Sequence, residues 1–144
     1  MIYTDMTKLA LRICFDAHKD QPDRGGLPYV YHPIHLAEQM HDETTIIVAL
    51  LHDVVEDSNY RLEDLKQLGF GEQVLDALTL LTHDDSVPYL EYIAAIRDNP
   101  IARTVKLADL EHNSDLSRLD HITPDDCERV RKYRNAQAIL QDQR

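Results

Sequence analysis

The sequence predicts an all-α protein in which residues 1–144 form a single helical bundle of seven or eight helices. Apolar residues recur three and four positions apart along most of the chain, which is the spacing that places them on one face of a helix. No segment alternates apolar and polar residues as a strand would, and Asn-Gly or Asp-Gly hairpin turns are absent. Short joints rich in polar residues, glycine and proline separate the helical segments.

The first predicted helix and the loop after it occupy residues 4–31. Thr4 or Asp5 can cap a helix of about 15 residues, which is expected to end near Lys19. Residues 20–31 hold two of the four glycines and two of the six prolines, so they predict a loop of about a dozen residues. Loops of this length in a compact domain are often functional.

Two further helices are expected after the loop. Proline suits the first turn of a helix, so the second helix is expected to open at His32-Pro33. After a break near Asp42, the apolar run of residues 46–51 predicts a helix that is buried on nearly all sides. This helix leads directly into the ionisable residues of the segment 52–57.

The second half of the chain is expected to add a short helix closed by Gly69 and then longer amphipathic helices. The final helix has a cap at Thr123 and is expected to run to the C-terminus. The helices between them are predicted at residues 71–82, at residues 88–98, and from residue 101 onwards.

Composition excludes several classes of protein. Lys and Arg number 15 against 26 Asp and Glu, and the formal net charge of −11 argues against nucleic-acid or membrane-surface partners. No apolar run approaches the roughly 20 residues of a membrane span, and the N-terminus lacks a signal-peptide pattern. Cys14 and Cys127 lack CxxC spacing and are expected to be reduced, which favours a cytoplasmic protein. The sequence leaves the oligomeric state open.

The densest group of ionisable residues follows the apolar helix. His52, Asp53, Glu56 and Asp57 fall within six positions of the segment ALLHDVVED. On a continuous helix His52 lies one turn from Glu56 and Asp53 one turn from Asp57, so the four share one broad face. Carboxylates this close repel each other unless a cation holds them. The alternative interpretation is a helix end that simply turns polar where it meets solvent.

Two more candidate metal ligands lie on other predicted helices. His32 opens its helix directly after the loop, and Asp109 follows an apolar stripe, where a carboxylate requires a partner. Together with His52 and Asp53 they supply two imidazoles and two carboxylates, a set that suits Mn, Fe, Co, Ni or Zn better than Mg or Ca. Such an ion can lower the pKa of bound water to about 7, which suits phosphoester hydrolysis. The chain has neither a P-loop nor a GxSxG nucleophile motif.

Three segments resemble the motifs of the HD phosphohydrolase superfamily. They read GLPYVYHP, LLHDVVED and KLADLEHN, and they match the forms GxPYxxHP, LLHDxVED and KLADxxHN in order. More narrowly, the chain is similar to the alarmone hydrolase domain of the RelA/SpoT enzymes and to the small alarmone hydrolases. The resemblance extends from about His18 to Leu140, nearly the whole chain. Three motifs in register are far more specific than an HD pair alone.

The resemblance implies an activity and a set of residue roles. Members of the family remove the 3′-pyrophosphate from guanosine tetra- or pentaphosphate with one bound ion, usually Mn²⁺, so the implied partner is a phosphorylated nucleotide. Glu56 and Asp57 match the acids that position or deprotonate the attacking water. Arg24 and Asn113 match residues that lie near the nucleotide. The implied metal ligands are His32, His52, Asp53 and Asp109.

The chain departs from the family pattern beside the implied nucleotide site. Asp23 stands where the family often has a second basic residue, Leu116 where it has a threonine, and Leu110 where it has an arginine. These changes leave the implied metal ligands intact but leave the nucleotide open. Hydrolysis of another phosphorylated nucleotide or dinucleotide is therefore an alternative. A catalytically silent module that binds a nucleotide is a third, which the intact acids and ligands disfavour.

Overall fold

The computed structural model describes residues 1–142, and it confirms the all-α prediction. Within these residues the only strand-type pairing is an isolated bridge between Pro22 and Pro28. The α-helices are α1 (Asp5–His18), α2 (Tyr31–Glu38), α3 (Glu43–Leu51), α4 (Val54–Asp57), α5 (Leu62–Gln67), α6 (Glu72–Leu81), α7 (Tyr89–Ile96), α8 (Pro100–Asn113) and α9 (Pro124–Gln141), with a 3₁₀ turn η1 (Leu116–Arg118).

The expected single helix through residues 46–57 is interrupted. Helix α3 ends at Leu51 and the one-turn helix α4 begins at Val54, because Asp53 has left the helical region with φ −108° and ψ 0°. If α4 is counted as the continuation of α3, the described residues form eight α-helices, within the predicted seven or eight. The interruption at His52 and Asp53 gives these two side chains directions that a continuous helix would not allow.

Local sequence signals set most of the helix starts. The Thr4 side chain accepts a hydrogen bond from the backbone N–H of Thr7, and Thr123 does the same for Asp126, which confirms both predicted caps. The second helix begins at Tyr31, one residue before the expected start. The last helix was expected to reach the C-terminus. Helix α9 ends at Gln141, and residues 143–144 lie outside the described residues.

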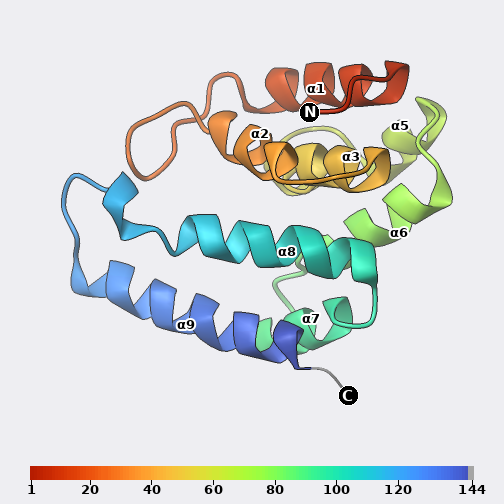
Figure 1. Ribbon diagram of the computed structural model, residues 1–144. Helices are drawn as coiled ribbons and strands as arrows, with labels where there is room; N and C mark the ends of the chain where they lie inside the picture. Colours follow the sequence, from red (N-terminus) through yellow and green to blue (C-terminus); the bar gives the residue numbers. More distant parts are fainter. Residues whose placement is uncertain (143–144) are drawn as a thin grey trace.

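Helix α3 is the centre of the bundle. Its residues 45–51 are all buried, and it packs against α1, α2, α6 and α8. Figure 1 shows the resulting layers, with α1 above α2 and α3, then α8, and α9 at the bottom against α8. The buried apolar side chains of the described residues form one continuous cluster. The polar ends of α2, α3 and α8 meet at the edge of this cluster.

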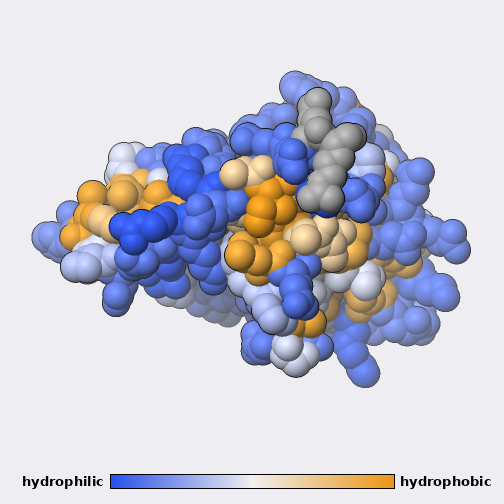
Figure 2. All heavy atoms as spheres, turned by 90° about the horizontal axis from the view of Figure 1, so that it is seen from below, coloured by the Kyte–Doolittle hydropathy of each residue, from blue (hydrophilic) through white to orange (hydrophobic). Residues whose placement is uncertain are grey.

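One face of the bundle is mostly polar. Seen from below, most of the surface is hydrophilic, and hydrophobic atoms gather in the middle of the face and at one end (Figure 2). Ala94 of α7 and Ala138 and Ile139 of α9 line a shallow hollow between these helices. None of the helices in residues 1–142 combines the length and the hydropathy needed to cross a membrane.

Candidate metal centre and adjoining pockets

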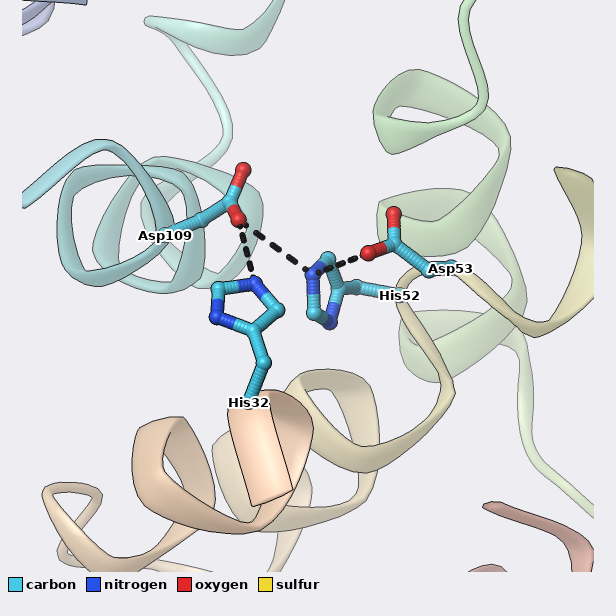
Figure 3. Close-up of side chains that lie close together, drawn as sticks. All are labelled: His32, His52, Asp53 and Asp109. Atoms are coloured by element: carbon cyan, nitrogen blue, oxygen red, sulfur yellow. Dashed lines mark hydrogen bonds and ion pairs between the residues drawn. The ribbon is translucent and has the colours of Figure 1, made fainter. Parts of the chain in front are cut away.

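The structure brings four predicted ligands together from three parts of the chain. Figure 3 shows His32 from α2, His52 and Asp53 from the junction of α3 and α4, and Asp109 from α8 facing one point. One ligand atom from each residue lies within 4.8 Å of the others. His32, His52 and Asp109 are buried, and the side chain of Asp53 is 20% exposed. The open side of the group therefore lies at Asp53.

Hydrogen bonding presents the second nitrogen of His52 to this point. His52 Nδ1 donates to the carbonyl oxygen of Ala49 at 2.6 Å, because a carbonyl can only accept. The other nitrogen, Nε2, lies 3.0 Å from Asp53 Oδ2 and 3.5 Å from Asp109 Oδ1. Among the described residues this buried nitrogen has no partner in hydrogen-bonding geometry. A backbone carbonyl on the far side of the ring is the usual support for a metal-binding imidazole.

The other three candidate ligands are also held by neighbouring side chains. His32 Nε2 lies 2.8 Å from Asp109 Oδ1, and His32 Nδ1 lies 2.7 Å from His112 Nδ1. The Tyr29 hydroxyl donates to Asp53 Oδ2. Asp109 accepts from Lys106 Nζ at 2.9 Å and from Asn113 Nδ2 at 3.0 Å. Each candidate ligand is thus oriented by a group outside the set of four.

The electrostatics of the four residues favour a bound cation. Burial alone raises the pKa of Asp109, but Lys106, His32 and His52 together lower it well below its ordinary value. Burial likewise opposes ionisation of Asp53, yet His52 lowers its pKa to about 2. Both carboxylates are therefore ionised. They raise the pKa of His52 against the effect of its burial, so positive charge is stabilised where His52 Nε2 points.

These observations fit a divalent metal ion. Two imidazole nitrogens and two carboxylate oxygens are a donor set for transition metals, and an ion at this point would replace the proton on His52 Nε2. Burial of the carboxylates without a cation would be costly. The donor set does not by itself select one metal.

The two acids that follow the cluster line the same cavity. Glu56 accepts a hydrogen bond from the backbone N–H of His83, while the Asp57 carboxylate has no hydrogen-bond partner within residues 1–142. Burial and the negative charge of Asp53 raise the pKa of Asp57. Burial and Asp53 also raise the pKa of Glu56, although the His83 N–H lowers it. Both are stronger bases than exposed carboxylates.

Two adjoining cavities surround this centre. One of them, the metal-side cavity, has a volume of about 300 Å³. It is lined by His52, Asp53 and Asp109 and by the two acids Glu56 and Asp57. The second, of about 380 Å³, is lined by His32 and by the loop at residues 22–25. The two cavities share Tyr29, Asn113 and Tyr133. Of the two predicted nucleotide-site residues, Asn113 lines both cavities and Arg24 lines only the second.

Several residues around the ligands stand in the HD-like motifs without a predicted role. Tyr29 belongs to GLPYVYHP, and its hydroxyl donates to Asp53. Lys106 and His112 belong to KLADLEHN; Lys106 pairs with Asp109 three positions later, and His112 contacts His32. Lys132 lies outside the three motifs, and its contact with Tyr89 is distant in sequence. Lys132 Nζ lies 4.0 Å from the ring centroid of Tyr89 and lines the metal-side cavity.

An all-α bundle with this His-His-Asp-Asp cluster defines an HD-type protein. No family model matches the chain. The mouse protein named guanosine-3′,5′-bis(diphosphate) 3′-pyrophosphohydrolase MESH1 is 38% identical over 76% of this chain and 68% of its own length. The structure of a metazoan ortholog of SpoT that hydrolyses ppGpp matches with a TM-score of 0.70 and 25% identity, over 97% of this chain and 94% of that one.

The chain therefore belongs to the family of guanosine-3′,5′-bis(diphosphate) 3′-pyrophosphohydrolases. Longer relatives also match. A probable GTP pyrophosphokinase of Mycobacterium leprae is 35% identical over 72% of this chain, which spans only 15% of that protein.

Proposed function

We propose that this protein is a metal-dependent phosphohydrolase that removes the 3′-pyrophosphate from guanosine tetra- or pentaphosphate. The observation that carries the proposal is the convergence of His32, His52, Asp53 and Asp109 within 4.8 Å. Three of them, His52, Asp53 and Asp109, line a cavity that also holds the carboxylates of Glu56 and Asp57. Relatives named for this activity support the choice of substrate. The partner is thus a small phosphorylated nucleotide, with no nucleic acid or membrane.

The four side chains would hold one divalent ion, and Mn²⁺ is our proposed occupant, with Fe, Co, Ni and Zn as ions that suit the same donors. When bound, the ion supplies acidified water and polarises a phosphoryl oxygen. Tyr29 and Lys106 hold the carboxylates of Asp53 and Asp109 in place, so these residues need not reorganise when the substrate arrives.

Glu56 and Asp57 are proposed to handle the proton of the attacking water. Their raised pKa values make them better proton acceptors than exposed carboxylates. Glu56 is held by the His83 N–H, which leaves its other carboxylate oxygen to orient the water. The Asp57 carboxylate, which has no partner among the described residues, is available to take the proton.

Charge in the metal-side cavity makes phosphate binding depend on the ion. Lys106 and Lys132 line this cavity against four acids, so with its histidines neutral, as in a metal-bound site, the protein contributes a formal charge of −2 that a divalent ion would balance. A pyrophosphate group would therefore be repelled without the ion. Arg24 and Asn113 are proposed to hold the remainder of the nucleotide on the other side of Tyr29. The two free thiols, Cys14 and Cys127, agree with a cytoplasmic location.

The test is a screen of phosphorylated nucleotides with added Mn²⁺, read as release of phosphate and pyrophosphate. We expect pyrophosphate from guanosine 3′,5′-bis(diphosphate), with loss of the activity in Asp53→Asn. Asp76→Asn, an exposed residue of α6, makes the same chemical change away from the site and should retain full activity. Equal activity of Asp53→Asn and the parent protein would refute the proposal, as would release from other nucleotides alone.

A further inference from the structure

Most of the charged side chains that line the cavity beside the metal centre form ion pairs with each other. It is the cavity of about 380 Å³ that contains Arg24, and it would receive the part of a nucleotide that extends away from a pyrophosphate at the metal. Three carboxylates and three guanidinium groups line it, so its formal charge is zero. They belong to Asp23, Asp115, Asp126, Arg24, Arg118 and Arg129.

Two of the three guanidinium groups are already engaged by acids. Arg118 Nη2 donates to Asp23 Oδ2 at 3.0 Å, and Arg129 donates to Asp126. Arg24 forms no ion pair with any residue in the described part of the chain, and its side chain is exposed. Arg24 is therefore the one guanidinium group of the cavity that is not ion-paired. Asp115, which accepts hydrogen bonds from Ser117, is the corresponding carboxylate without an ion pair among the described residues.

Asp23 is fixed firmly enough to hold Arg118 in this pairing. Its side chain is 8% exposed, and its Oδ1 accepts from the backbone N–H groups of Gly25 at 2.8 Å and Leu27 at 2.9 Å. Burial opposes ionisation of Asp23, but these N–H groups and Arg118 lower its pKa. Arg118 is held from its other side, because its Nη1 donates to the carbonyl oxygen of His112 at 3.0 Å.

The backbone of the loop also closes on Arg118. A Cβ atom at Gly25 would collide with the carbonyl oxygen of Arg118, so the two segments approach as closely as glycine allows. The ion pair and this contact join residues 95 positions apart, Asp23 and Arg118, across the wall of the cavity. Arg118 is thus not free to turn toward a ligand without losing Asp23.

We propose that the Asp23–Arg118 ion pair determines specificity by limiting how many phosphates the protein accepts on the 5′ side of its substrate. The inference rests on the proposed function, because it takes the 3′-pyrophosphate to lie at the metal centre. A nucleoside with one 5′-phosphate meets a cavity of zero formal charge in which Arg24 is the guanidinium group available to a phosphate. Each further 5′-phosphate adds negative charge that the wall cannot match, since Asp23 has neutralised Arg118.

The same pair could be only a structural closure of the loop, and substitution of Asp23 separates the two roles. Asp23→Asn keeps an amide oxygen for the N–H groups of Gly25 and Leu27 but releases the charge of Arg118. Arg118→Met removes the cation and leaves Asp23 charged. A specificity role predicts opposite shifts in the two variants, whereas a purely structural role predicts parallel losses on every substrate.

The experiment measures kcat/KM with Mn²⁺ for guanosine 3′-diphosphates that carry one, two or three 5′-phosphates. In the parent protein we expect kcat/KM to fall as 5′-phosphates are added. In Asp23→Asn, the ratio of kcat/KM for one 5′-phosphate to kcat/KM for three should be at least about threefold smaller than in the parent protein. In Arg118→Met the same ratio should be larger. The control is Asp76→Asn, which changes net charge equally but lies on the exposed face of α6 and should reproduce the parent ratios.

Unchanged ratios in Asp23→Asn, or parallel losses in both variants, would overturn the specificity role while leaving the proposed function intact. If none of the three compounds is hydrolysed, the proposed function fails, and the inference that rests on it fails with it.

Discussion

His32 Nδ1 lies 2.7 Å from His112 Nδ1, and the two imidazole planes are inclined by only 5°. Two ring nitrogens at this distance must share one proton, so one donates and the other accepts. If His32 binds a metal through Nε2, its proton resides on Nδ1 and His112 is the acceptor. Burial and the neighbouring His32 lower the pKa of His112 to about 4, which keeps His112 neutral and able to accept. In that case the contact selects the tautomer of His32 that leaves Nε2 free for a metal.

Replacement of His112 by phenylalanine should therefore weaken metal binding without removing a ligand. The ring is kept, but the acceptor for His32 Nδ1 is lost, and such changes typically cost 10- to 100-fold in metal affinity, so we expect about that loss. Titration of the metal-free protein with Mn²⁺ measures the effect. His41→Phe, at an exposed position between α2 and α3, is the control. Parent-like affinity in His112→Phe would show that the contact does not set the tautomer.

Removal of the metal should destabilise the protein. A ligand at 100 times its dissociation constant stabilises the native state by about 2.7 kcal/mol, which shifts Tm by roughly 5–10 °C for a chain of this size. We expect Mn²⁺ to raise Tm by this amount in the parent protein. Asp109→Asn should abolish the shift, because it weakens the most buried carboxylate ligand and disturbs the contacts of His32 and Lys106. Thermal unfolding with and without chelator measures it, and an equal shift in Asp109→Asn would exclude Asp109 as a ligand.

Replacement of Glu56 or Asp57 by the matching amide should reduce turnover but leave metal and fold in place. Proton transfer by a positioned side chain contributes about 10²- to 10⁴-fold, so kcat should fall within that range in at least one of the two variants. Metal content and the rate of pyrophosphate release are both measured. If metal content falls in step with the rate, Glu56 and Asp57 bind the ion and our division of roles is wrong.

The parts of the structure that the sequence predicts are those encoded locally. Caps such as Thr4 and Thr123 act on residues three positions away, so a short segment is enough to recognise them. The order of the three HD-like motifs indicated which histidines and aspartates would meet. The interruption after α3 was not predicted, because the apolar run and the acids after it are compatible with a continuous helix.

Lys106 and Asn113 lie within one helical turn of Asp109, but the contacts of Tyr29 and His112 could not be predicted because they are distant in sequence. His32 and His112 are 80 positions apart, and Tyr29 and Asp53 are 24 apart. Asp23 was recognised only as a departure from the family pattern. Its partner Arg118 became evident when the packing of the loop against η1 was known. Helix periodicity carries no information on such pairs.

Arg24 and Asn113 should differ in their kinetic effects, because they occupy different places relative to the metal. Arg24 is exposed and lines only the cavity away from the ion, so Arg24→Ala should mainly raise KM. Asn113 lines both cavities and donates to Asp109 Oδ1 at 3.0 Å, so Asn113→Ala should change kcat as well as KM. Steady-state kinetics on the best substrate of the nucleotide screen distinguish the two patterns. An unchanged KM in Arg24→Ala would remove Arg24 from the nucleotide site, and the one guanidinium group of that cavity without an ion pair would then have no role in binding.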